Sequence, residues 1–167
     1  MKMKKIDKIN DNHILNYLKS RNENFNRSKM INSNKIEFIN HFIWWFTNKR
    51  EIFYYKINKA QIIYFWHEII KFKNTKFVIG GWHSNSRKIN LIYVLYALKW
   101  QLKYNKKNNI KYDWIAVVKK NNKWILKLTK YLGYESVKNN SIHYKAIKKN
   151  FKVRRKDFYF LKLKTKL

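Results

Sequence analysis

The chain has 167 residues and carries 39 Lys and Arg against 9 Asp and Glu, a formal net charge of +30. This length fits one domain with extensions, and the absence of cysteine excludes disulfides, thiol catalysis and cysteine-based metal sites. No apolar run in the sequence reaches the roughly 18 residues that cross a bilayer. The charge therefore indicates a polyanionic partner, with RNA or DNA first and an anionic membrane second.

The first third of the chain is predicted to contain little regular structure before a short helix. Residues 1–35 are polar and rich in Lys and Asn, which is typical of an extension that a partner orders or of a flexible tail. Apolar residues at spacings of three and four then predict a helix over 37–47. Its two tryptophans indicate packing, with base stacking as the alternative. Aromatic and β-branched runs predict strands over 51–57 and 60–70.

A strand, a loop and a long helix are predicted next. Residues 77–81 form the strand, which ends at a glycine pair and makes a hairpin with the preceding strand. The polar, basic segment 82–89 is predicted to be a loop. Over about 90–104, apolar residues recur on one stripe that must bury against a sheet, and Asn90 is predicted to cap the first turn.

The last third of the chain is predicted to contain one more buried strand, a helix and a basic tail. Residues 113–118 are predicted to form a strand, and the continuous apolar run from Trp114 to Val118 indicates burial on both faces. A second helix follows to about Leu132, with Gly133 at the position where helices often end in a left-handed residue. Residues 141–147 are predicted to add an edge strand. The segment 145–167 has ten Lys or Arg and one acid, which predicts an interaction tail that is disordered when alone.

The alternation of strands and helices from residue 77 onward predicts an α/β fold, a mixed sheet with helices packed on it and right-handed crossovers. We divide the chain into an N-terminal extension with a short helix (1–57), an α/β RNA-binding core (58–147) and a basic C-terminal tail (148–167). Within the tail, aromatic and leucine residues over 158–163 indicate an added strand or a docking peptide.

No catalytic or metal-binding constellation stands out in the sequence. The carboxylates around the central strands and helices are Glu68, Asp113 and Glu135, too few for the acid cluster of a metal-dependent nuclease. The five histidines include no i, i+4 pair, and each is interpreted as a packing or phosphate-contact residue. The glycine pair lacks the continuation of a phosphate-binding loop. The sequence therefore predicts no catalytic residue, no metal and no cofactor.

The order of elements from Phe77, with Asn121–Asn122 before a helix that ends at Leu132-Gly133-Tyr134, resembles the C-terminal half of a GCN5-type acetyltransferase. That family implies a glycine-rich loop before the central helix, whose backbone N–H groups bind the pyrophosphate of coenzyme A. Here the corresponding loop is Asn85-Ser86-Arg87-Lys88-Ile89-Asn90, which contains no glycine. A degenerate acetyltransferase-like protein is therefore one alternative, and a basic DNA-packing protein is another.

A second resemblance covers roughly residues 58–156 and gives the main interpretation. The order is similar to that of small-subunit ribosomal protein eleven, although the glycine–proline loop of that family is Lys120-Asn121-Asn122 here. The matching segments come at similar spacing, and they are Gly80-Gly81, Ser86-Arg87-Lys88, Asn109-Ile110-Lys111, Ala116-Val117-Val118-Lys119, Leu132-Gly133-Tyr134 and the basic run 151–156.

The ribosomal resemblance implies a structural constituent of the small-subunit platform, without enzyme activity. Its implied partners are small-subunit rRNA and neighbouring ribosomal proteins, with no membrane and no small-molecule substrate. The drift from the family pattern resembles a divergent mitochondrial version that the organelle itself encodes.

Three basic groups are predicted to contact rRNA: the loop before the long helix, the turn before the second helix, and the tail. Lysines in such places neutralise phosphates and release counterions, so binding is expected to be salt-sensitive. The residues of these groups are Ser86, Arg87, Lys88, Lys119, Lys120, Lys123, Lys148, Lys149, Lys152, Arg154, Arg155 and Lys156.

Overall fold

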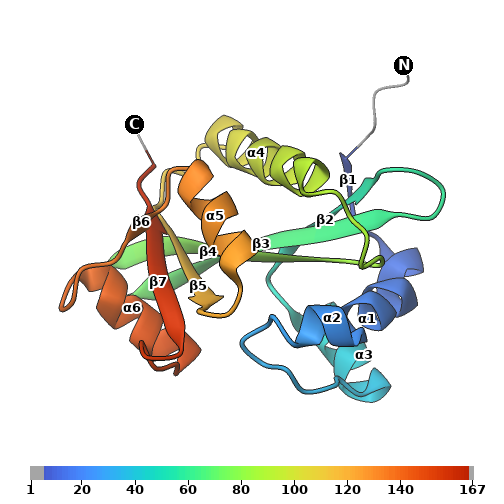
Figure 1. Ribbon diagram of the computed structural model, residues 1–167, viewed down its shortest axis with the longest axis horizontal. Helices are drawn as coiled ribbons and strands as arrows, with labels where there is room; N and C mark the ends of the chain where they lie inside the picture. The colour runs from blue at the N-terminus through green and yellow to red at the C-terminus, as the bar shows by residue number, and fades with distance from the viewer. Residues whose placement is uncertain (1–5, 166–167) are drawn as a thin grey trace. The chain divides into compact units, whose positions relative to one another are not determined.

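A computed structural model describes residues 6–165 of the chain (Figure 1). They form a mixed α/β fold whose seven-stranded sheet has the order β1-β2-β3-β4-β5-β7-β6. The described residues divide into two compact units: unit 1 comprises residues 6–68 and 80–101, and unit 2 comprises residues 69–79 and 102–165. The α/β fold with a mixed sheet and packed helices confirms that part of the sequence-based expectation.

Unit 1 contains the N-terminal helices, the first strands and most of the longest helix. β1 pairs antiparallel with β2, and β2 pairs antiparallel with β3. Three elements, β3, β4 and α4, contribute residues to both units. The bounds are β1 (Ile6–Lys8), the 3₁₀ turn η1 (Asp11–His13), α1 (Ile14–Asn22), α2 (Asn24–Arg27), α3 (Phe38–Thr47), β2 (Glu51–Lys56), β3 (Ile62–Phe72), β4 (Thr75–Ser84) and α4 (Leu91–Lys107).

Helices cover both faces of β2 and β3 in unit 1. Since successive side chains of a strand point to opposite faces, neighbouring residues of β3 contact different helices. On one face, Trp100 of α4 lies 5.2 Å from Phe53 and 5.9 Å from Phe65, measured between ring centroids. On the other face, Tyr64 lies 5.3 Å from Tyr17 of α1. Figure 1 shows α4 and the helices α1–α3 on opposite sides of β2. Burial on both faces explains why aromatic residues follow one another in the sequences of these strands.

Gly81 of β4 leaves room for the indole ring of Trp66. A Cβ atom at this position would lie 3.1 Å from that ring, and the guanidinium carbon of Arg50 lies 3.6 Å from a ring centroid of the same indole. We expect Gly81→Ala to lower the free energy of unfolding by about 1–2 kcal/mol, because overpacking displaces the ring from Arg50. Urea unfolding of wild type and variant measures this, and equal midpoints would contradict it.

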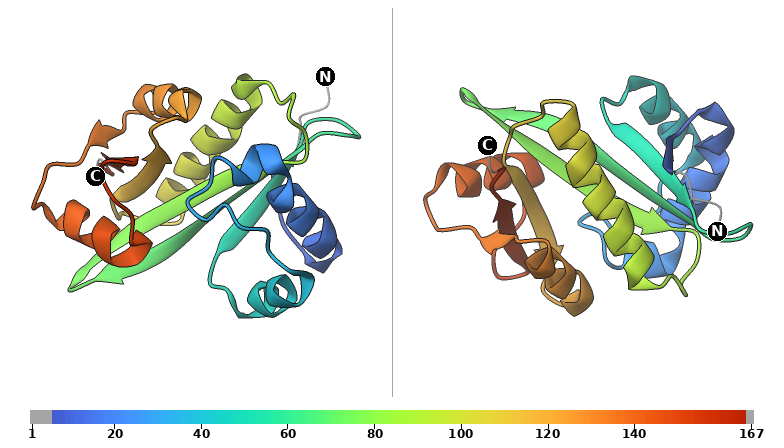
Figure 2. Two further views of the ribbon diagram at one scale, coloured as in Figure 1. Left: turned by 60° about the horizontal axis from the view of Figure 1, so that its bottom comes forward. Right: turned by 90° about the horizontal axis from the view of Figure 1, so that it is seen from above.

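Unit 2 is built around β5 and β7, which pair antiparallel. β5 also pairs parallel with β4, where Val78 lies opposite Trp114, and β6 pairs antiparallel with β7. The helix α6 packs against β5 and β7 (Figure 2). The bounds are β5 (Trp114–Lys119), α5 (Lys123–Tyr131), β6 (Glu135–Ser136), α6 (Ile142–Phe151) and β7 (Phe158–Leu163).

Polar contacts of one carboxylate join three segments of unit 2. His143 Nε2 of α6 lies 2.8 Å from Asp113, just before β5, and the backbone N–H of Thr165, just after β7, donates to the other oxygen of Asp113 at 3.1 Å.

Gly133 follows α5 and has a φ of 88°, which confirms the predicted left-handed helix end.

The structure departs from the sequence-based expectation near both ends of the chain. The irregular structure expected over 1–35 is wrong for the described residues, since β1, η1, α1 and α2 form there. The edge strand expected over 141–147 is also wrong: the Ser141 hydroxyl accepts a hydrogen bond from a backbone N–H and caps α6, whose inner face is buried. Instead of a disordered tail, residues 148–165 form the end of α6 and the strand β7, which confirms the strand expected over 158–163.

The other predicted elements are confirmed, with ends displaced by a few residues. They are α3, β2, β3, β4, α4, β5 and α5. The functional boundaries at residues 57 and 147 stay a prediction, and α6 runs across the second of them.

Candidate functional site at the end of β4

The loop between β4 and α4 is held in place by its own polar side chains. Asn85 reaches the start of β3, where its Oδ1 accepts a hydrogen bond from the Ile62 N–H at 2.8 Å and its Nδ2 donates to the Ala60 carbonyl at 2.9 Å. The Ser84 hydroxyl donates to the Ser86 carbonyl at 2.8 Å. The loop is thus tied to β3 before the helix begins.

The start of α4 combines a helix N-terminus with two exposed cations. Asn90 Oδ1 accepts a hydrogen bond from the Ile92 N–H at 3.0 Å, which confirms the predicted cap. Arg87 and Lys88 precede the cap and are both exposed. The partial positive charge at the N-terminus of this 17-residue helix adds to their charges. This end of α4 therefore attracts anions such as phosphates.

The absence of glycine from this loop causes no backbone strain. Every described residue with a positive φ lies elsewhere in the chain. A Cβ on each loop residue nevertheless keeps an anion farther from the backbone than a glycine would. Contacts with a phosphate would therefore fall mainly to the side chains of Arg87 and Lys88.

A buried group of polar side chains, here called the His83 cluster, lies in unit 1 and consists of His83, Ser20, Tyr17 and Tyr64. His83 Nδ1 lies 2.8 Å from the Ser20 hydroxyl, and the His83 ring lies 4.5 Å from Tyr17 and 5.3 Å from Tyr64. His83 Nε2 and the Tyr64 hydroxyl are buried without a hydrogen-bond partner in the described part of the chain. Each such atom costs roughly 1–3 kcal/mol, so the cluster carries two hydrogen-bonding atoms that the described part of the chain leaves unpaired.

Burial keeps the His83 cluster uncharged at neutral pH. Burial, reinforced by the charges of Arg21 and His41, lowers the pKa of His83 to about 3. Burial raises the pKa of Tyr17 and the pKa of Tyr64 to about 12. The cluster therefore offers neutral hydrogen-bonding groups.

The neutral imidazole of His83 predicts an acid-sensitive fold. Its pKa is lower in the folded chain than the ordinary value of about 6.5, so the unfolded chain binds more protons below that pH. The stability that neutral His83 contributes is complete above about pH 6.5 and is lost as the pH falls toward about 3. From this group we expect the free energy of unfolding to fall by about 2 kcal/mol between about pH 7 and about pH 5.

Urea unfolding of wild type and His83→Gln at both pH values measures this dependence. Burial also lowers the pKa of His41 and of His67, so the variant should keep part of the acid sensitivity. A variant with the full pH dependence of wild type would show that His83 does not carry it.

The residues predicted to contact rRNA lie in both units. One group is the loop before α4 in unit 1, and the other two lie in unit 2, between β5 and α5 and from the end of α6 to the turn before β7. The first group is Ser86, Arg87 and Lys88, the second is Lys119, Lys120 and Lys123, and the third is Lys148, Lys149, Lys152, Arg154, Arg155 and Lys156.

Three cations of the third group have hydrogen-bond partners within unit 2. Lys148 Nζ donates to the Val153 carbonyl at 3.2 Å, Arg154 Nε donates to the Asp157 carboxylate at 2.9 Å, and Arg155 donates to the Val137 carbonyl at 2.9 Å. The segment is therefore a folded part of unit 2, and some of its basic side chains form hydrogen bonds within that unit. Contacts of these residues with a nucleic acid stay a prediction.

Nothing in the sequence singles out the His83 cluster as a site. The sequence-based expectation for His83 is a packing or phosphate-contact role, and the burial of the ring agrees with packing. Because side chains alternate along a strand, Gly81 and His83 lie on the same face of β4. This shared face is the one signal of the His83 cluster that the sequence offers. Ser20 and Tyr17 lie in a segment that was expected to be irregular, so their contact with His83 was not predictable.

Comparison with solved structures identifies the fold. The structure matches a ribosomal-protein-alanine N-acetyltransferase from Brucella melitensis with a TM-score of 0.71 and 11% identity, covering 95% of this chain and 98% of that one. It matches an N-acetyltransferase from Staphylococcus aureus with a TM-score of 0.68 and 12% identity, covering 97% and 98%. It also matches the Campylobacter jejuni N-acetyltransferase PseH in complex with acetyl coenzyme A, with a TM-score of 0.58 and 15% identity, covering 97% and 99%. No family model matches the sequence, and no curated sequence matches it significantly.

These matches correct the main interpretation of the sequence. The structures that share the fold over nearly the whole chain include N-acetyltransferases, and two of the matching structures contain acetyl coenzyme A. The identification with ribosomal protein eleven is therefore wrong, and so are the non-enzymatic role, the rRNA and ribosomal-protein partners and the exclusion of a small-molecule substrate. The weaker resemblance to GCN5-type acetyltransferases agrees with the fold. The mitochondrial location stays a prediction.

Proposed function

We propose that this chain binds acetyl coenzyme A, or a related acyl coenzyme A, and transfers the acyl group to an amine. The observation that carries the proposal is the fold match, which extends over 95–98% of the chain and includes structures named as N-acetyltransferases and structures that contain acetyl coenzyme A. When bound, the coenzyme supplies an activated acyl thioester.

The loop before α4 fits the phosphates of such a ligand. Arg87 and Lys88 are exposed beside the N-terminus of α4, so their charges and the helix dipole act on the same anion. Arg87 can place two N–H groups on one phosphate, whereas Lys88 acts as a compact charge. The side chains thereby take over the contact that a glycine-rich loop makes with its backbone.

In this proposal, the unpaired atoms of the His83 cluster hydrogen-bond a neutral polar group of the substrates. His83 Nε2 and the Tyr64 hydroxyl are both buried and without a partner in the described part of the chain, and both groups are uncharged at neutral pH. The charges of Arg21 and Arg50 act on the same cluster. Nearby positive charge disfavours an ammonium ion, so this surrounding favours the neutral amine that can attack a thioester.

Calorimetric titration with acetyl coenzyme A tests the proposal. We expect one binding site with a dissociation constant in the micromolar range, about 1–100 µM, as is common for enzyme substrates. ADP serves as the control, since it carries the diphosphate without the pantetheine arm and reports attraction to charge alone. Equal affinity for ADP, or no binding of acetyl coenzyme A, would contradict the proposal. Release of free thiol with a panel of amines would then identify the acceptor.

A further inference from the structure

The outer face of α3 is an exposed apolar stripe in a strongly cationic chain. The helix contains no Lys, Arg, Asp or Glu. Its exposed large side chains recur at spacings of three and four, which places them on one face of the helix. The exposed fractions are 51% for Phe38, 61% for Ile39, 42% for Phe42, 57% for Ile43 and 58% for Phe46.

The opposite face of α3 anchors the helix to unit 1. His41 is 2% exposed, and its Nε2 lies 3.2 Å from the Ile14 carbonyl of α1. Trp44 and Trp45 lie 5.9 and 5.7 Å from Tyr17, measured between ring centroids. On the outer face, Phe42 lies 5.9 Å from Phe38 and 5.0 Å from Phe46. The stripe therefore lies on the outer side of a helix whose inner side is anchored in unit 1.

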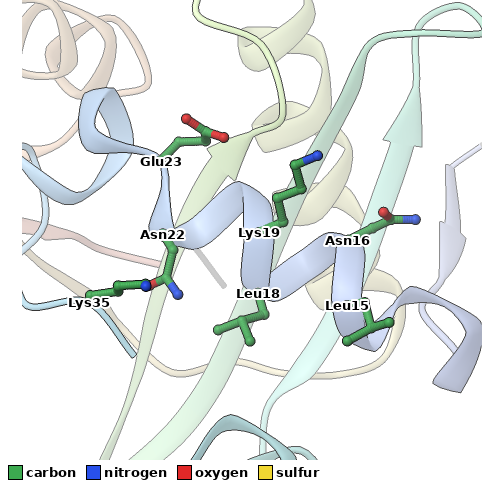
Figure 3. Close-up of a pocket in the computed structure, with 7 residues that line it drawn as sticks. All are labelled: Leu15, Asn16, Leu18, Lys19, Asn22, Glu23 and Lys35. Atoms are coloured by element: carbon green, nitrogen blue, oxygen red, sulfur yellow. The ribbon is translucent and has the colours of Figure 1, made fainter. Parts of the chain in front are cut away.

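Exposed lysines flank α3 in sequence, and lysines line a hollow along the neighbouring helix α1. Lys35 and Lys49 flank α3 in sequence and are both exposed, with one exposed acid, Glu37, between them. A surface hollow of about 460 Å³ runs along α1, and its lining includes Leu15, Lys19, Glu23 and Lys35. Figure 3 shows Lys19 and Lys35 at this hollow, to which exposed Leu15 also contributes. Apolar and cationic groups thus share this part of unit 1.

We propose that the outer face of α3 docks on an anionic lipid bilayer, with the helix lying in the plane of the interface. A helix of ten residues is about 15 Å long, and none of the described helices is long and apolar enough to cross a membrane. Apolar side chains of a helix in the interface reach roughly 5–10 Å into the boundary between headgroups and acyl chains. Lysines beside them attract anionic headgroups.

Area and charge favour a bilayer over a second copy of the chain. Five half-exposed side chains present a few hundred Å² of apolar surface, whereas a stable protein interface buries about 800 Å² on each partner. Two copies would each carry a net charge of +30 and repel one another. The same charge strengthens binding to an anionic membrane. The proposal does not rest on acyltransferase activity.

The experiment uses the absence of cysteine from the chain, because an introduced cysteine is labelled uniquely. An environment-sensitive fluorophore is attached to Ile43→Cys on the stripe or to Trp124→Cys on α5, a control position that is 66% exposed. Each labelled chain is mixed with phosphatidylcholine vesicles that contain or lack phosphatidylserine. We expect the fluorescence emission to shift to the blue only for the label at position 43 and only with vesicles that contain phosphatidylserine.

Vesicle sedimentation adds a measurement of affinity. Ile39→Ser/Ile43→Ser should lower partitioning into phosphatidylserine vesicles roughly tenfold, whereas Trp124→Ser/Tyr131→Ser should leave it unchanged, and urea midpoints verify that both variants fold. Equal partitioning of the two variants, or no blue shift at position 43, would show that net charge alone accounts for vesicle binding, and would overturn the proposal. A dimer that only the α3 substitutions dissociate would assign the face to a second copy and would overturn it equally.

Discussion

Replacing Arg87 and Lys88 together with glutamine is expected to weaken acetyl coenzyme A binding about thirty-fold. Hydrogen bonds to charged groups contribute about 1.5–3 kcal/mol, and solvent screening at these exposed positions reduces this to about 1 kcal/mol for each side chain. A total loss of about 2 kcal/mol corresponds to about thirty-fold in the dissociation constant. Calorimetric titration measures it, and the difference from wild type should shrink as salt is added.

A matched control lies at the other end of the same helix. Lys106 and Lys107 are exposed in the last turn of α4, and Lys106→Gln/Lys107→Gln removes the same net charge. We expect this variant to bind acetyl coenzyme A within about twofold of wild type, since screening weakens attraction over such distances. If both double variants lose affinity to the same extent, net charge and not the loop before α4 holds the ligand.

Tyr17→Ala is expected to lower the free energy of unfolding by about 3–5 kcal/mol, the usual cost of removing a large buried aromatic side chain. Tyr17 is 3% exposed. Its ring lies 4.5 Å from His83, 5.3 Å from Tyr64 and 5.9 Å from Trp44, which belong to β4, β3 and α3. Truncation leaves a cavity among these rings, and urea unfolding measures its cost.

Tyr17→Phe is the conservative control, because it keeps the ring and removes the hydroxyl that interacts with Arg50. We expect it to stay within about 1 kcal/mol of wild type. If Tyr17→Ala were as stable as wild type, α1 would be a detachable part of the chain, as the sequence-based extension over 1–57 implied. The pair of variants thus measures how firmly the N-terminal segment belongs to the core.

The ribosomal interpretation failed for a physical reason. Ser86-Arg87-Lys88 indicates a polar loop after a strand, and Leu132-Gly133-Tyr134 indicates the end of a helix. Both are local signals, and they recur in any α/β chain with the order strand, helix, strand, helix. Such signals do not specify which strands are neighbours in a sheet, and the arrangement of the whole sheet separates one α/β fold from another. The surplus of lysine then added apparent support, since charge alone does not identify a partner.

Some of the polar residues of the candidate site were predictable from the sequence, and others were not. The cap at Asn90 and the basic pair Arg87–Lys88 follow from residue type and position, and the structure places them together because they are adjacent in sequence. The His83 cluster was not predictable, because Ser20 and His83 are 63 residues apart. Its shifted pKa values arise from burial, which only the packed chain creates.

The sequence by itself determined the local elements: the helices α3 and α4, the left-handed end of α5 at Gly133, the strands of aromatic residues and the excess of positive charge. Each of these depends on neighbours within a few residues, where periodicity and turn chemistry act. Only the tertiary structure decided that helix α1 joins the core, that β1 pairs with β2 and that α1 meets β4 at His83. Those contacts depend on which distant surfaces fit together, and periodicity shows which face is buried without showing what covers it.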